Sequence, residues 1–309
     1  MSLIDALLLE LEIPTPIQKI DFPGVDLQIK REDLNHPTVQ GNKWRKLKYN
    51  LLHYLEGNYK GVVSFGGAFS NHIYATAAAC EKLDIPCKLF LRGYALDDHN
   101  PTIRFIRESG AEIELLTPSA YRQKTERPFS KLLTDKNYYV IPEGGTNELG
   151  IKGAKELGEE ILDQSVVAPD YVCVAAGTGG TAIGLIQAFA NVKTKVLVFS
   201  SLKGDFLNEI IQENVGEAYY QLKTEYHMGG YGKFNRELVD FCNAFKEVHD
   251  VRLDPVYTGK MMYGINNMIN ENYFNSRDKV VVIHTGGMQG VEGFNYRYGE
   301  KLGRLEYFF

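Results

Sequence analysis

The sequence is poor in the features that mark metal sites, redox pairs and membrane spans. Its four cysteines, at positions 80, 87, 173 and 242, form no Cys-x-x-Cys pair, so neither a zinc site nor a redox dithiol is indicated. The apolar stretch at residues 4–10 is too short and too acidic for a signal peptide or a membrane span. We therefore expect a cytoplasmic protein that holds no metal and contacts no membrane.

The sequence also lacks an excess of positive charge. Its 34 Lys and Arg against 39 Asp and Glu give a net charge of −5, and no stretch concentrates basic residues, which argues against a nucleic-acid partner. With 44% hydrophobic and 24% charged residues, the 309-residue chain has the composition of a soluble globular protein. It contains no internal repeat or low-complexity linker, and we expect a small-molecule substrate.

Short apolar runs alternate with helical patterns from about residue 60 onward. The runs typical of buried strands are residues 61–65, 87–91, 112–116, 138–141, 171–175, 195–199 and 279–283. This alternation predicts an α/β fold with parallel sheets. Because the strands form two series, we expect two lobes with a ligand cleft between them. A small lobe of residues 44–142 would then be inserted into a large lobe made of residues 1–43 and 143–309.

A glycine-rich run, Ala-Ala-Gly-Thr-Gly-Gly-Thr-Ala at residues 175–182, joins a predicted strand to a predicted helix. Free backbone N–H groups and the helix dipole make such a junction an anion site, and glycines let a phosphate approach the backbone. Gly177, Gly179 and Ala182 also satisfy the dinucleotide fingerprint. However, no acidic residue follows the strand at 195–199 to hold a ribose, so a nicotinamide oxidoreductase is the weaker alternative.

A second strand-to-helix loop, residues 64–72, ends in Ser-Asn-His before an alanine-rich helix. It would suit a substrate carboxylate, although an ordinary helix N-cap explains the same pattern. Polar, glycine-rich segments at 229–232, 254–260 and 284–287 repeat this theme. Lys43 lies in the run Gln-Gly-Asn-Lys-Trp-Arg-Lys-Leu at 40–47. Most lysines are solvated surface charges, so the argument for Lys43 depends on these loops.

Taken together and in order, these motifs resemble a known family over nearly the whole chain. The motifs are Lys-Arg-Glu-Asp at 30–33, Gly-Asn-Lys-Trp-Arg-Lys-Leu at 41–47, Ser-Asn-His at 70–72, the glycine loop at 177–181, Pro-Val-Tyr-Thr-Gly-Lys at 255–260 and His-Thr-Gly-Gly at 284–287. They are similar to those of pyridoxal-phosphate (PLP) enzymes with the tryptophan synthase β-like fold, in the branch of 1-aminocyclopropane-1-carboxylate (ACC) deaminase and D-cysteine desulfhydrase. The resemblance implies two lobes, each a mostly parallel sheet covered by helices, and a homodimer.

The resemblance also implies roles for individual residues. Lys43 would hold PLP as a Schiff base, and Asn71 would bind the ring oxygen of the cofactor. The phosphate would be bound by Gly177, Thr178, Gly179, Gly180 and Thr181. Ser70, Asn71 and His72 would contact the substrate, with the Ser70 hydroxyl beside its carboxylate. Tyr231 and Tyr257 match the family's two active-site tyrosines, which flank the substrate and exchange protons with it.

Thr258 and Thr285 divide the branch, because ACC deaminases have Glu and Leu there whereas D-cysteine desulfhydrases have Thr at both positions. A neutral hydroxyl against the pyridine nitrogen leaves that nitrogen unprotonated and the electron sink shallower, which favours β-elimination over cyclopropane opening. We therefore expect a lyase that converts D-cysteine to pyruvate, ammonia and sulfide. The alternatives are ACC deaminase, which gives 2-oxobutyrate and ammonia, and a PLP-binding protein without turnover.

Trp44 and Tyr74 depart from the family pattern. Both are expected near the pocket, where they would affect the choice of substrate. A D-amino acid other than D-cysteine therefore stays open as the substrate.

Overall fold

The structure is a computed structural model that describes residues 11–124, 137–216 and 218–306. Its strands are β1 (Ile17–Ile20), β2 (Asp26–Lys30), β3 (Val62–Gly66), β4 (Cys87–Arg92), β5 (Glu112–Leu116), β6 (Tyr139–Val140), β7 (Tyr171–Ala176), β8 (Lys195–Ser200), β9 (Tyr220–Lys223) and β10 (Lys279–Ile283). Its helices are α2 (Asn42–Glu56), α3 (Asn71–Lys82), α4 (Pro101–Glu108), α5 (Pro118–Arg122), α7 (Glu148–Asp163), α8 (Gly180–Ala188), α9 (Phe206–Val215), α10 (Arg236–His249), α11 (Thr258–Asn270) and α12 (Gln289–Leu302), with short 3₁₀ turns at η1 (Glu32–Leu34) and η2 (Glu143–Gly145).

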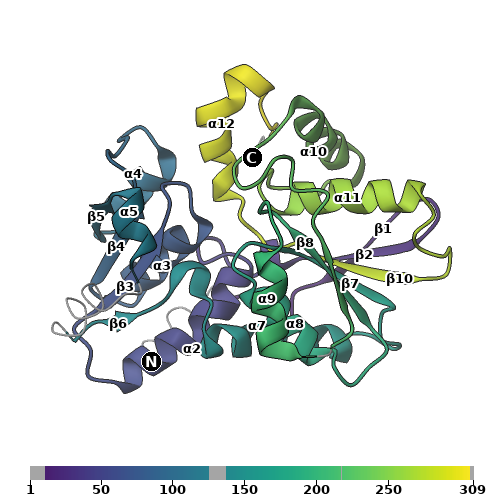
Figure 1. Ribbon diagram of the computed structural model, residues 1–309, viewed down its shortest axis with the longest axis horizontal. Coiled ribbons are helices and arrows are strands. Elements are labelled where there is room, and N and C mark those ends of the chain that lie inside the picture. The colour runs from purple at the N-terminus through teal and green to yellow at the C-terminus, as the bar shows by residue number, and fades with distance from the viewer. Residues whose placement is uncertain (1–10, 125–136, 217, 307–309) are drawn as a thin grey trace.

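The strands form two sheets that lie side by side in Figure 1. The larger has the order β1-β2-β10-β7-β8-β9 and the smaller β5-β4-β3-β6. Every adjacent pair is parallel except β1 with β2. The expected α/β class with two mostly parallel sheets covered by helices is confirmed.

The larger sheet is buried on both faces. Along β7, Cys173 and Ala175 pack into a core with α10, α11 and α12, whereas Val172 and Val174 pack into a second core with α7, α8 and α9. A strand covered on both sides needs apolar residues at every position. This is why β7, β8 and β10 are visible in the sequence as continuous apolar runs.

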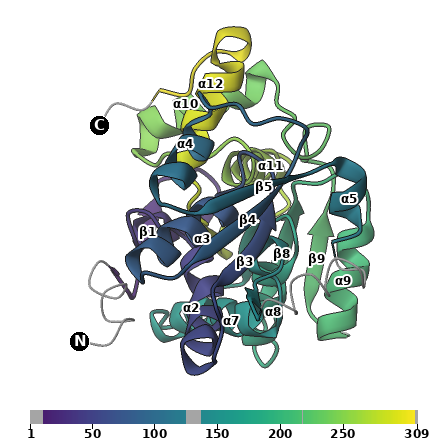
Figure 2. The same cartoon turned by 90° about the vertical axis from the view of Figure 1, so that its left-hand side faces the viewer.

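The smaller sheet, which faces the viewer in Figure 2, is covered less evenly. Val62 of β3 packs with α2 and α3. On the opposite face Val63 and Phe65 pack with Phe90 and with Tyr121 of α5. The strands of this sheet therefore also read as apolar runs.

The sequence patterns did not predict β1, β2 and β9, in which polar residues interrupt the apolar ones. β2 runs parallel to β10, with Lys30 opposite Ile283. β2 thereby lies in the larger sheet beside β10, the strand that Thr285 follows by two residues. Within the described residues, no helix combines the length and apolarity needed to cross a membrane.

Helix α2 packs against α7 (Figure 1). A buried ionic cluster lies at this junction. Arg45 of α2 donates to both oxygens of Glu32, at 2.8 Å each, and to Glu160 of α7 at 2.9 Å. The ammonium of Lys30, which is 0% exposed, lies 2.5 Å from the other Glu160 oxygen. Two residues of the Lys-Arg-Glu-Asp motif thus join β2, α2 and α7.

Candidate active site

A cavity of about 420 Å³ is lined by loops at the C-terminal ends of strands from both sheets. Of the residues singled out in the sequence, those lining it are Lys43, Ser70, Asn71, His72, Gly177, Thr178, Gly179, Thr181, Tyr231, Tyr257 and Thr285. Gly180 and Thr258 are buried but do not line it. Segments far apart in the chain therefore meet at the edge where parallel sheets hold their ligands.

Lys43 is the second residue of α2, and the start of that helix is fixed to the end of β10. The amide of Asn42 donates to the Thr285 carbonyl at 3.2 Å. The Asn35 side chain accepts from the Gly41 amide at 2.7 Å and donates to the Gly41 carbonyl at 3.0 Å. Gly41 has φ 70°, and a Cβ on it would lie 2.0 Å from the Thr285 oxygen. Only glycine fits there, which explains the Gly-Asn-Lys order.

The Lys43 amine is buried inside the cavity. Desolvation lowers its pKa to about 8, although the negative charge of Asp254 opposes the shift. Burial lowers a lysine pKa because the charged ammonium loses its hydration. The neutral, nucleophilic form of the amine is therefore far more populated near neutral pH than it is for an ordinary lysine.

Lys46, one helical turn after Lys43, lines the same cavity. Its ammonium donates to the Gly144 carbonyl at 2.8 Å and to the Thr146 hydroxyl at 3.3 Å. Burial and the nearby charge of Lys43 lower its pKa well below the ordinary value. Sequence reasoning missed this residue. Its spacing of three from Lys43 was the available signal, because residues three apart share one helix face.

The glycine loop leads from β7 into α8, with Gly179 in the left-handed conformation at φ 86°. The Thr181 hydroxyl accepts from the Asn42 side chain at 2.9 Å, and the hydroxyls of Thr178 and Thr146 lie 2.6 Å apart. The first turn of α8 presents its N–H groups at this end of the cavity. Together with the amine of Lys46, it forms a site suited to a phosphate, whose negative charge would favour the protonated form of that buried amine.

The loop from β3 to α3 borders the cavity. Ser70 caps α3 by accepting from the His72 amide at 3.2 Å. The Asn71 side chain accepts from Gln289 at 2.7 Å, and a Cβ at Gly287 would lie 2.5 Å from its nitrogen. His72 hydrogen-bonds Ser64 at 2.8 Å. Burial and the charges of Lys43 and Lys46 hold the pKa of His72 well below its ordinary value, so it contributes a neutral ring.

Tyr231 and Tyr257 also line the cavity, and their ring centroids lie 6.2 Å apart. Burial raises the pKa of both hydroxyls, although 42% of the surface of Tyr231 is exposed. A hydrogen bond between the two hydroxyls lowers the pKa of Tyr231 and raises the pKa of Tyr257. Tyr231 is therefore the more readily ionised of the two, and both carry a proton at neutral pH.

The two threonines at the branch-dividing positions have different surroundings. Thr285 lines the cavity. Thr258 is fully buried, and its hydroxyl donates to Asp254 at 2.6 Å. Asp254 also accepts from the amides of Val256, Tyr257 and Thr258 at 2.8 to 2.9 Å. Asp254 therefore holds the turn that presents Tyr257, a role that the sequence alone does not assign.

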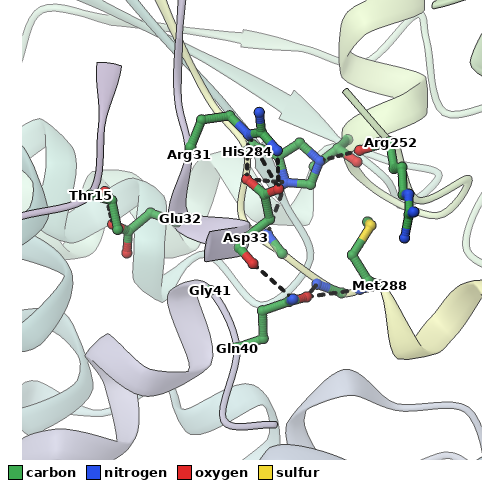
Figure 3. A network of polar contacts seen from close by, with 12 residues as sticks. Thr15, Arg31, Glu32, Asp33, Gln40, Gly41, Arg252, His284 and Met288 are labelled. Atoms are coloured by element: carbon green, nitrogen blue, oxygen red, sulfur yellow. Dashed lines mark hydrogen bonds and ion pairs between the residues drawn. The ribbon is translucent and has the colours of Figure 1, made fainter. Parts of the chain in front are cut away.

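Gln40 fastens the loop after β10 to the segment before α2 (Figure 3). Its side-chain oxygen accepts from the amides of Gly287 and Met288 at 3.0 Å each, and its nitrogen donates to the Asp33 carbonyl at 2.8 Å. The Asp33 carboxylate accepts from Arg31 at 2.7 to 3.2 Å. The remaining residues of the Lys-Arg-Glu-Asp motif thus support the wall that contains Thr285.

His284 lies in this network and faces away from the cavity. Its Nδ1 lies 3.4 Å from Asp33, and its Nε2 hydrogen-bonds the Arg252 carbonyl (Figure 3). The ring is 1% exposed. It is a satisfied buried histidine, the more frequent role for such a residue.

The expectation that Trp44 and Tyr74 lie at the pocket is wrong. Trp44 is buried in the core with Leu47 and Leu51, and Tyr74 stacks on Phe105 at 3.9 Å between centroids. Neither lines the cavity. Consecutive helical residues point about 100° apart, so adjacency to Lys43 in sequence did not bring Trp44 to the site.

Comparison with known proteins shows what the chain is similar to. The profile of a family described as pyridoxal-phosphate dependent enzyme matches residues 8–286. A Pyrococcus furiosus protein provisionally named 1-aminocyclopropane-1-carboxylate deaminase is 31% identical, over 93% of this chain and 92% of that one. The bifunctional D-cysteine desulfhydrase/1-aminocyclopropane-1-carboxylate deaminase of Arabidopsis thaliana, named as mitochondrial, is 30% identical over 90% and 77%. The crystal structure of an ACC deaminase homologue superposes with a TM-score of 0.82 at 28% identity, over 97% and 98%.

Proposed function

The chain belongs to the family of pyridoxal-phosphate-dependent enzymes, and we propose that it eliminates the β-substituent of a D-amino acid, D-cysteine foremost. The products would be pyruvate, ammonia and sulfide. Relatives that share 30% or more of its residues support a PLP-dependent lyase.

The cavity residues fit the cofactor. The desolvated amine of Lys43 would hold its aldehyde carbon, and the glycine loop with Lys46 would hold its phosphate. Asn71 and Thr285 would flank its ring. When bound, the cofactor supplies an electron sink for the charge that develops at the substrate α carbon.

The chain's own groups would bind the substrate and move its protons. The N-terminus of α3, with the hydroxyl of Ser70, would bind the carboxylate. The free amine of Lys43 would be a base whose lowered pKa suits removal of the α proton. The hydroxyls of Tyr257 and Tyr231, which also line the cavity, would form a second proton path.

The observation that carries the choice of reaction is the neutral side chain of Thr285 in the cavity wall. A hydroxyl supports an unprotonated ring nitrogen, whereas a carboxylate would keep that nitrogen protonated. The weaker electron sink is sufficient when charge leaves with the β-substituent. ACC deamination is the second candidate, because both curated relatives carry that name. A protein without turnover is disfavoured because both tyrosines are present.

The test is a substrate panel with the purified protein. D-cysteine, L-cysteine, β-chloro-D-alanine, D-serine and ACC are compared side by side, with pyruvate, 2-oxobutyrate and sulfide measured separately. We expect pyruvate from D-cysteine and β-chloro-D-alanine, with sulfide equal to pyruvate for D-cysteine. Preference for L-cysteine would contradict the chirality, and 2-oxobutyrate as the main product would favour the second candidate.

A further inference from the structure

Lys260, the last residue of the motif at 255–260, is a buried lysine that the proposed function leaves without a task. It is the third residue of α11, is 2% exposed and does not line the cavity. Burial lowers its pKa to about 8, although the negative charge of Asp254 opposes the shift. A lysine is rarely buried this completely, because the charged amine loses its hydration. Its burial therefore points to a partner that uses its N–H groups.

That partner is the backbone of the loop that carries Tyr231. The Lys260 amine donates to the carbonyl of Gly230, the residue directly before Tyr231, at 2.9 Å. The same amine lies 5.5 Å from the centroid of the Phe234 ring, three residues after Tyr231. A lysine amine keeps N–H donors whether it is charged or neutral, so this bond can persist on both sides of its pKa. Lys260 thus contacts the chain before and after Tyr231.

The loop itself, residues 228–232, belongs to a stretch that contains no helix or strand between positions 224 and 235. The Gly230 amide donates to the His227 carbonyl at 3.0 Å, and the Gly230 carbonyl also accepts from the Lys233 amide at 3.2 Å. Glycine has more conformational freedom to lose than any other residue, so a bond from a neighbouring helix matters most here. Four residues of the loop have a positive φ, from 55° to 116°: Met228, Gly229, Gly230 and Gly232.

We propose that Lys260 is a positioning residue that holds the hydroxyl of Tyr231 beside that of Tyr257; this rests on the proposed elimination, in which the two hydroxyls move protons. Tyr257 is the N-cap residue of α11, three positions before Lys260, and the two tyrosine rings lie 6.2 Å apart. The first turn of α11 therefore carries one tyrosine and anchors the loop of the other. Proton transfer needs both hydroxyls in a fixed relative geometry.

A double-mutant cycle separates this role from a general contribution to the fold. kcat and KM for D-cysteine are measured with the holoenzyme for the unmodified protein, Lys260→Met, Tyr231→Phe and the double variant. Methionine has a similar length and no N–H donor, and the Gly230 carbonyl keeps the Lys233 amide as a donor, so the fold should persist. Lys260→Gln, which is too short to keep the bond, takes its place in the cycle if the methionine variant does not fold.

The matched control is Lys223→Met, which removes another buried lysine of the same sheet region. Lys223 of β9 is 7% exposed, lies 4.4 Å from the centroid of the Tyr273 ring and does not line the cavity. Hydrogen exchange followed by mass spectrometry supplies a readout that does not depend on turnover. We expect residues 228–233 to exchange faster in Lys260→Met than in the unmodified protein, and at an unchanged rate in Lys223→Met.

We expect Lys260→Met to lower kcat by on the order of 10-fold to 100-fold with little change in KM, because a misplaced hydroxyl slows the proton-transfer step. In the Tyr231→Phe background the same substitution should cost less than about threefold, because the hydroxyl that it positions is gone. Lys223→Met should keep kcat and KM in both backgrounds.

Equal losses from Lys260→Met in the two backgrounds, full turnover by Tyr231→Phe, or unchanged exchange of residues 228–233 would overturn the inference and leave the elimination standing. If the unmodified enzyme forms no pyruvate from D-cysteine, the proposed function fails. Faster exchange of residues 228–233 in Lys260→Met would then still support the anchor, and unchanged exchange would overturn it as well.

Discussion

Two lysines one helical turn apart in the same cavity are suited to different tasks. Lys43 has Asp254 as its opposing charge, and its pKa is lowered to about 8. Lys46 is hydrogen-bonded to the Gly144 carbonyl and the Thr146 hydroxyl beside the glycine loop. The first is placed to react and the second to bind an anion. The atoms that surround each amine decide its task, since both residues are lysines of one helix.

The assignment of Lys43 can be tested by chemical labelling. Borohydride reduction of the holoenzyme followed by peptide mapping should find the cofactor on Lys43. Lys43→Ala should lose turnover and the absorbance band of the lysine-bound cofactor, because Lys46, the other lysine lining the cavity, is hydrogen-bonded to the Gly144 carbonyl and the Thr146 hydroxyl. A label on Lys46 or elsewhere would show that the assignment is wrong.

The lowered pKa of Lys43 predicts how cofactor capture depends on pH. Only the neutral amine attacks an aldehyde, and neutral Lys43 dominates above its pKa of about 8 rather than above the ordinary 10.5. The rate at which cofactor-free protein captures pyridoxal phosphate should rise with pH and level off above about 8. Stopped-flow absorbance measures this rate. A rate that keeps rising past pH 10 would contradict the desolvated environment.

Thr258 and Thr285 should respond differently to loss of the hydroxyl. Thr258→Val removes the hydroxyl that donates to a buried Asp254 oxygen at 2.6 Å and accepts from the Asp254 amide at 2.9 Å, which should lower the free energy of unfolding by about 1–3 kcal/mol. Thr285→Val should produce the larger change in the cofactor spectrum. Urea unfolding and absorbance spectra measure the two effects. The reverse pattern would place Thr258 at the cofactor instead.

The same geometry bears on exchanging the two threonines for the residues of ACC deaminases. In Thr258→Glu with Thr285→Leu, the new carboxylate would lie against Asp254 in a buried site. Two carboxylates there repel one another and lose hydration. We therefore expect this double substitution to lose D-cysteine turnover and stability together, measured by pyruvate formation and urea unfolding. Efficient ACC deamination by a stable double variant would contradict this arrangement.

At the scale of elements, polar groups hold α2 to the elements of the larger sheet and to α7. Its N-terminus bonds to the end of β10, and Arg45 bonds to Glu32 and Glu160 in the buried cluster with Lys30. Burial alone would raise the pKa of Glu160, but Arg45 and Lys30 outweigh it and the pKa lies below its ordinary value. The cluster therefore fixes the helix that carries the reactive lysine.

Glu160→Gln should be strongly destabilising, because it leaves Lys30 and Arg45 buried with less compensating charge. Breaking one partner of a buried ion pair costs about 3–5 kcal/mol. The control Glu159→Gln removes an exposed carboxylate 3.4 Å from Lys155 and should change stability by about 0.5 kcal/mol or less. Urea unfolding of both variants checks this.

The pH dependence of stability shows whether the effect of Glu160→Gln is electrostatic. A lowered carboxyl pKa stabilises the fold above the unfolded value and loses that contribution as pH falls through the folded value. The stability gap between the unmodified protein and Glu160→Gln should therefore shrink on acidification. A gap that stays constant as pH falls would assign the effect to packing.

At the scale of the whole molecule, the sequence revealed the parts whose signal is local. Strands buried on both faces gave continuous apolar runs, so β7, β8 and β10 were predicted within one residue of their observed bounds. β2 was not predicted, because polar residues interrupt it and its partner β10 lies some 250 positions later in the chain. The division into residues 44–142 and the rest stays a prediction.

In the site, too, the sequence predicted the residues that belong to a local pattern and missed those that only tertiary packing brings together. The loops at Ser70 and Gly177 were found because a strand, a turn and a helix follow one another there. Lys46 and Asp254 were missed because their roles depend on which elements meet around them. Thr258 and Thr285 look equivalent as motif positions, yet only Thr285 lines the cavity. Adjacency in sequence predicts an element, and tertiary packing decides the contact.

The most direct test of the account is the ratio of kcat/KM for D-cysteine to that for ACC, measured with the unmodified holoenzyme. It depends on the cofactor, the proton-moving groups and the neutral Thr285 wall acting together in one cavity. The account predicts a ratio well above one, with sulfide and pyruvate formed in equal amounts and little 2-oxobutyrate from ACC. A ratio below one, with 2-oxobutyrate as the faster product, would contradict the proposed elimination and the argument from Thr285.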